Sequence, residues 1–149
     1  MSFTQSIFAN KTLMASILAW FVAQCLKVVH TLIVDKRFNF SRLVGSGGMP
    51  SSHSAFVMAL TTATGLTHGC QSTLFAVSLV FSLIIMYDAA GVRHAVGKQA
   101  SIINKMIEDI HNKKEKNITE KRLKELIGHT PIEVMAGAIL GIIIANIVI

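Results

Sequence analysis

The sequence predicts an all-α integral membrane protein: a helical bundle of about four transmembrane helices with a cytoplasmic amphipathic helical insertion. Of the 149 residues, 52% are hydrophobic and only 15% are charged, whereas soluble domains carry about a quarter charged residues. The mean hydropathy is +0.56, and the apolar residues are grouped in runs that are long enough to cross a bilayer. This length suits one domain, residues 1–149, rather than two.

Four apolar runs form the expected spans, at about residues 13–34, 50–69, 72–90 and 131–149. Lys and Arg are concentrated in the segments 35–48 and 93–128, whereas the link 68–71 has neither. Because basic loops favour the cytoplasmic side, both basic segments are expected there, with both chain termini on the far side. The net charge of +6 is then better explained by topology and anionic lipid than by nucleic acid.

The insertion, residues 94–128, contains apolar residues at helical spacing: Ile102, Ile103, Met106, Ile107 and Ile110. This pattern predicts an amphipathic helix that lies against the membrane or against a neighbouring subunit.

Polar residues interrupt the first span. Gln24, Lys27 and His30 lie about one turn apart and are expected on one face. A lysine within a span is costly unless it is paired or reaches the interface, so a functional role is the default hypothesis for Lys27. The alternative is that Lys27 extends along the helix to the membrane surface.

The second span opens with Gly47-Gly48-Met49-Pro50-Ser51-Ser52-His53-Ser54. Proline in a first turn, with serine at the N-cap, is typical of a helix start. The leading N–H groups and the helix dipole make such a start an anion site, at which His53 can exchange a proton. The alternative is a serine-rich turn that only caps the helix. Small residues then recur every fourth position, which favours close helix packing: Ala55, Ala59 and Ala63.

The last two spans add further candidates at the same membrane face. The third span ends near Asp88 and Arg93, which are expected at the membrane edge. The alternative to a functional role is that they merely form an ion pair at the interface. The fourth opens with Gly128-His129-Thr130-Pro131-Ile132-Glu133, in which His129 and Glu133 are four residues apart and can share one face. Gly137 and Gly141 form a small-xxx-small step.

The predicted topology brings the two histidine-bearing helix starts, Arg93 and the inner end of the first span to one membrane face. Two helix N-termini, two cations and two imidazoles at one place suit a phosphate group better than a neutral ligand.

These residues resemble a known superfamily. Pro50-Ser51-Ser52-His53 resembles the Pro-Ser-Gly-His motif of the PAP2 superfamily of lipid phosphatases and vanadium haloperoxidases, and His129 to Gly137 resembles its closing His-x-x-x-Asp motif and the small-residue helix after it. Nearly the whole chain, including Tyr87 to Arg93, resembles the divergent PAP2 family of small bacterial membrane proteins. Ser52 stands where the superfamily has glycine, and Glu133 where it has aspartate.

The resemblance implies a lipid-phosphate phosphatase that needs no metal or other cofactor. His129 would be the nucleophile, Glu133 would orient its ring and His53 would be the acid and base. The residues implied in phosphate binding are Lys27, Ser51, Ser52 and Arg93, with Asp88 orienting Arg93.

Two of these assignments have alternatives. The superfamily's arginine precedes the closing histidine by six residues, where this chain has Leu123; Arg93 is the preferred substitute and Arg122 the second choice. The superfamily's first motif, a lysine followed by Arg-Pro, has no clean match, so Lys27 is preferred, with Lys36 and Arg42 behind it.

The expected partners are a lipid phosphate substrate and membrane lipids, with a possible homodimer to shield the site and no nucleic acid. The expected location is the bacterial cytoplasmic (inner) membrane, with the site on its cytoplasmic side. The competing hypothesis is a non-catalytic protein that binds or transports anionic lipid or scaffolds partners, with Gln24 and Lys27 lining a polar path. A purely structural bundle leaves the paired histidine motifs unexplained.

Overall fold

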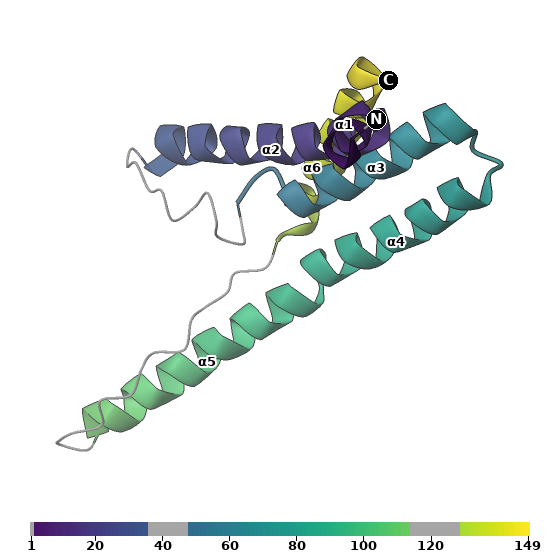
Figure 1. The fold of residues 1–149 in the computed structure, drawn as a ribbon. Coiled ribbons are helices and arrows are strands. Elements are labelled where there is room, and N and C mark those ends of the chain that lie inside the picture. The colour runs from purple at the N-terminus through teal and green to yellow at the C-terminus, as the bar shows by residue number, and fades with distance from the viewer. Residues whose placement is uncertain (1, 36–47, 114–128) are drawn as a thin grey trace.

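The computed structural model describes residues 2–35, 48–113 and 129–149, without the side chains of 34–35, 92–94, 98 and 108–113. Throughout these ranges the regular structure is helical, which confirms the predicted all-α class (Figure 1). The helices are α1 (Phe3–Ala9), α2 (Lys11–Asp35), α3 (Ser52–His68), α4 (Thr73–Ala90), α5 (Val92–Lys113) and α6 (Pro131–Val148).

Three segments of the described chain are long and apolar enough to cross a membrane: Lys11–Ile33, Thr73–Ile107 and Pro131–Val148. The helix α3 has 17 residues, about 25 Å at 1.5 Å per residue, which is shorter than the roughly 20 residues of a usual span. The membrane bundle is therefore present, and the fourth crossing stays a prediction.

The helix α5 continues the direction of α4 almost without a break (Figure 1). Gly91, between them, keeps right-handed backbone angles (φ −101°, ψ −76°). Helical hydrogen bonds run through it, because its N–H donates to Tyr87 O at 2.8 Å and its carbonyl accepts from Ala95 N–H at 3.0 Å. Part of the expected insertion is thus a helical extension of the third span, and its residues 114–128 lie outside the described part.

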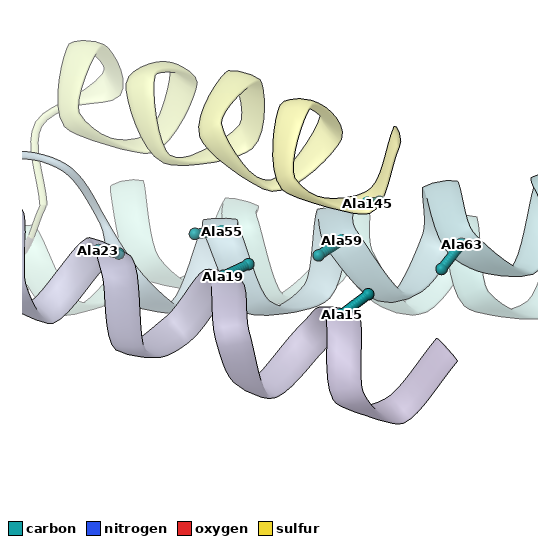
Figure 2. Packing of buried hydrophobic residues seen from close by; sticks show 7 residues of the cluster. All are labelled: Ala15, Ala19, Ala23, Ala55, Ala59, Ala63 and Ala145. Carbon is teal, nitrogen blue, oxygen red and sulfur yellow. The ribbon is translucent and has the colours of Figure 1, made fainter. Parts of the chain in front are cut away.

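The helix α3 is the centre of the bundle and packs against α2, α4 and α6. Its alanines meet those of α2 along a seam in which every side chain is fully buried (Figure 2). Alanine at every fourth position lets the two helix backbones approach closely. The seam consists of Ala15, Ala19 and Ala23 of α2, Ala55, Ala59 and Ala63 of α3, and Ala145 of α6.

Glycines bring α6 onto the backbone of α3. A Cβ on Gly137 would overlap the carbonyl oxygen of Ser51, and a Cβ on Gly141 would lie 2.9 Å from the backbone nitrogen of Ala59. Any larger residue would therefore force the helices apart, which confirms the packing role predicted for the small-xxx-small step. The contacts also fix the direction: α3 and α6 begin at the same end and run side by side.

A cluster of hydroxyl groups joins α3 to α4. Thr61 Oγ1 and Ser82 Oγ are 2.6 Å apart, and Ser82 Oγ donates to Val57 O at 3.0 Å. Both side chains are buried, so these hydrogen bonds satisfy polar groups that the bilayer would not.

Candidate functional site

The candidate site lies at the end of the bundle where α3 and α6 begin and α4 ends. The Ser51 N–H, at the N-cap of α3, donates to Glu133 O in the first turn of α6 at 3.0 Å. The His129 N–H donates to Ala89 O in the last turn of α4 at 3.2 Å. Two backbone hydrogen bonds therefore hold together three segments that are far apart in the sequence.

The His129 ring and the Glu133 carboxylate are in hydrogen-bond contact at this end of the bundle. His129 Nδ1 lies 3.2 Å from Glu133 Oε2, and the histidine is only 1% exposed. An ionised carboxylate can only accept hydrogen bonds, so this contact assigns the proton to Nδ1. The buried Nε2 atom then carries the lone pair, which is the arrangement that a nucleophilic imidazole requires.

Thr130 fixes the carboxylate of Glu133 through a capping box. The Thr130 N–H donates to Glu133 Oε2 at 2.9 Å, and the Glu133 N–H donates to Thr130 Oγ1 at 3.4 Å. The same carboxylate oxygen thus serves the N-terminus of α6 and the histidine.

His53 is brought next to His129. It lies in the first turn of α3, is exposed, and its ring centroid is 6.1 Å from that of His129 at an interplanar angle of 65°. The two rings meet edge to face, one buried beside a carboxylate and the other open to the surroundings. The two histidines that the sequence singled out are therefore neighbours.

The serines of the first motif hold the start of α3. Ser51 and Ser52 are buried, and Ser51 Oγ accepts hydrogen bonds from the Ser54 N–H at 3.4 Å and the Ser54 hydroxyl at 3.1 Å. Ser51 thus caps α3 and ties it to α6. The first N–H groups of a helix have no intrahelical partner, so the amides of Ser52 and His53 are the groups suited to an anion.

Lys27 of α2 is 2% exposed and lies near the segment that leads into α3. Its Cγ is 3.2 Å from the position that a Cβ would occupy on Gly48, whose φ of +89° itself favours glycine. The aliphatic part of Lys27 therefore packs against the chain that leads into α3.

Gln24 shares the buried face of α2 with Lys27, but His30 is exposed, so the prediction of one common face is wrong for His30. Each step of three residues rotates the position by 300°, and two such steps place His30 about 120° from Gln24.

The remaining candidates are only partly described. Asp88 is half-buried in the last turn of α4. Arg93 lies in the first turn of α5, and its side chain is outside the described part. Arg122, Lys36 and Arg42 also lie outside the described residues. The orientation of Arg93 by Asp88 stays a prediction.

The chain as a whole matches a known family. The model of the Divergent PAP2 family matches residues 8–144. The chain belongs to the divergent PAP2 family. It is also 43% identical over 147 residues, 93% of each chain, to the protein named "Uncharacterized membrane protein YuiD" of Bacillus subtilis (strain 168). No solved structure matches. Together with the apolar helices, these relationships place this divergent PAP2 protein in a membrane.

Thr130 is the site residue that sequence reasoning missed. The signal was present, because Thr-x-x-Glu before an apolar run is a capping-box pattern. The contacts of Ala89 with His129 and of Gly48 with Lys27 had no such signal, since each joins separate elements of this divergent PAP2 protein.

Proposed function

We propose that this protein is a membrane phosphatase that hydrolyses a lipid phosphate, a phosphoric monoester or diphosphate, through a phosphohistidine at His129. The observation that carries the proposal is the buried His129 ring, with Nδ1 on Glu133 at 3.2 Å and its edge against the ring of His53. Membership of the divergent PAP2 family supports the same chemistry.

The reaction has two displacements at phosphorus. In the first, His129 Nε2 attacks the phosphorus and the bond to the lipid oxygen breaks, while protonated His53 gives its proton to the leaving oxygen. In the second, His53 takes a proton from water, the water oxygen attacks phosphorus, and the P–N bond breaks. Inorganic phosphate is released and both histidines return to their starting forms. Glu133 stabilises the charge on the His129 ring throughout.

The phosphoryl oxygens need positive partners as charge develops in the transition state. The groups proposed for this task are the side chains of Lys27 and Arg93 and the N-terminal amides of Ser52 and His53. Ser51 would act by holding those amides in place, and Asp88 by orienting Arg93.

The proposed location is the bacterial inner membrane, with the site on the cytoplasmic side, because in the sequence the two basic segments, 35–48 and 93–128, immediately precede the two histidine-bearing helix starts. The lipid would then enter from the surrounding bilayer, and a second copy of the chain would complete the shielding of the site as a homodimer.

Phosphate release from defined lipids tests the proposal. The purified protein in nanodiscs is supplied with phosphatidate, isoprenyl monophosphate or isoprenyl diphosphate, and inorganic phosphate is measured. His129→Ala should abolish release, whereas His68→Ala, at the exposed far end of α3, should leave it unchanged. Release that survives His129→Ala would overturn the proposal.

The second candidate function is binding, transport or scaffolding with anionic lipid and no reaction. Burial of Gln24 and Lys27 on one face of α2 favours it, since polar residues inside a bundle mark a polar path. This function predicts that the wild type releases no phosphate, binds vesicles of phosphatidate, and loses that binding in Lys27→Met.

A further inference from the structure

We infer that Thr130 is a positioning residue: it selects the reactive tautomer of His129 by fixing the carboxylate of Glu133. The inference rests on the proposed function for its kinetic consequence, and its structural part stands apart from that function. Thr130 itself is exposed and acts on the histidine only through Glu133.

One carboxylate oxygen of Glu133 makes both contacts. Glu133 Oε2 accepts from the Thr130 N–H at 2.9 Å and from His129 Nδ1 at 3.2 Å. A glutamate side chain has several rotamers and loses entropy when it is held in one. The short contact with the Thr130 amide holds the oxygen at the place where it also meets the imidazole.

The capping box adds a second hydrogen bond in the opposite direction, from the Glu133 backbone to the Thr130 side chain. Thr130 has extended backbone angles (φ −71°, ψ 154°), and its Oγ1 accepts the Glu133 N–H at 3.4 Å. These angles turn its own N–H back toward the carboxylate. Loss of the hydroxyl removes half of the box and frees the first turn of α6, so the carboxylate no longer has a single position beside His129.

The same geometry gives a reason for glutamate at position 133. The third residue of a capping box must reach back to the N-cap amide, and glutamate or glutamine is the usual residue there. Aspartate is shorter by one methylene, so it cannot reach the Thr130 amide and His129 Nδ1 together. Glu133→Asp should therefore impair the site, although it conserves the charge.

The test measures the tautomer directly. The full-length protein is labelled with ¹⁵N-histidine in detergent micelles, and the His129 signals among the six histidines are assigned by their absence in His129→Gln. The wild type should show Nδ1–H. Thr130→Ala should give a mixture of tautomers, and Thr130→Ser should restore the wild-type signal.

A matched control removes a different cap. Ser72 Oγ accepts the Phe75 N–H at 3.2 Å at the start of α4, so Ser72→Ala costs a comparable hydrogen bond and should leave the His129 signals unchanged. In phosphate release, Thr130→Ala should lower kcat by up to about tenfold, the effect of losing one hydrogen bond between neutral groups, here Glu133 N–H to Thr130 Oγ1, and leave KM unchanged.

An unchanged Nδ1–H signal in Thr130→Ala, or an equal change in Ser72→Ala, overturns the inference. If Thr130→Ala does not fold, Thr130→Val, which keeps the shape of the side chain and loses the hydroxyl that accepts the Glu133 N–H, decides: an unaltered tautomer overturns the inference, and a mixture supports it. A wild type with no phosphatase activity would remove the proposed function, while the tautomer series would still decide the role of Thr130.

Discussion

At the scale of single residues, His53 and His129 are neighbours in unlike environments. His129 is buried and held by Glu133, whereas His53 is exposed. A ring with a fixed tautomer suits attack on phosphorus, and an exposed ring suits proton exchange. The two environments are therefore consistent with the proposed division of roles, His129 as nucleophile and His53 as acid and base.

The role of His53 as acid predicts an effect that depends on the leaving group. With an alkyl lipid phosphate, His53→Ala should slow phosphate release by about 10²- to 10⁴-fold, because the alkoxide must be protonated as it leaves. With 4-nitrophenyl phosphate as the substrate, the initial burst of nitrophenol should be much less affected, since nitrophenolate leaves without a proton. Stopped-flow absorbance measures the burst, with His68→Ala as the control. Equal slowing for both substrates would rule out this role.

At the scale of helices, the contact between α3 and α6 fixes the positions of the two histidines relative to each other along the helix axes. Gly137 packs on the carbonyl of Ser51, and the Ser51 N–H donates to Glu133 O. Gly137 of α6 and Ser51 at the N-cap of α3 thus form a tight helix contact next to the site.

Gly137→Ala should move α3 and α6 apart at this contact. The added methyl group would overlap the carbonyl oxygen of Ser51, and overpacking of this kind costs about 1–3 kcal/mol of stability. We expect a lower melting temperature in detergent and a loss of phosphate release that exceeds the loss of folded protein, because His53 and His129 move apart. Ile139→Phe, which adds bulk at an exposed position of α6, should change neither quantity. A Gly137→Ala protein with wild-type stability would show that α6 does not approach α3 this closely.

The helices also show which features could be predicted from the sequence. The spacing of Ala55, Ala59 and Ala63 and the pair His129 and Glu133 were readable, because residues four apart on a helix share a face. The meeting of the two histidines followed from the distribution of basic residues.

Other features were not readable. The exposure of His30 and the packing of Lys27 on Gly48 depend on the rotation of α2, and a helix that is apolar on most sides gives little signal for its rotation. Likewise, a glycine such as Gly91 can end a helix or lie within one, and the sequence does not show that helical hydrogen bonds continue through it from α4 into α5. Contacts between elements, such as Ser51 with Glu133, require the packed bundle.

At the scale of the whole molecule, the central position of α3 explains how a helix of 17 residues with several polar side chains fits inside a membrane bundle. It has three neighbouring helices, and several of its hydroxyl-bearing residues are buried among them, including Ser54, Thr61 and Thr64. Protein rather than lipid surrounds these groups, so α3 needs less apolar surface than a helix that faces the bilayer.

The arrangement of α3 beside α4 predicts a fourth crossing. The two helices are joined by the short link 69–72 and are held together at Thr61 and Ser82, so α3 must traverse the depth that α4 traverses. In a Cys25→Ser background, the exposed Cys70 of this link should react with a membrane-impermeant maleimide in intact cells. With Cys70 also replaced by serine, Gln99→Cys in α5 should react only after permeabilisation. If both cysteines are protected in intact cells, the link lies on the side of the histidines and α3 does not cross. Labelling of Cys70 alone places α3 across the membrane and the paired histidines on the inner side.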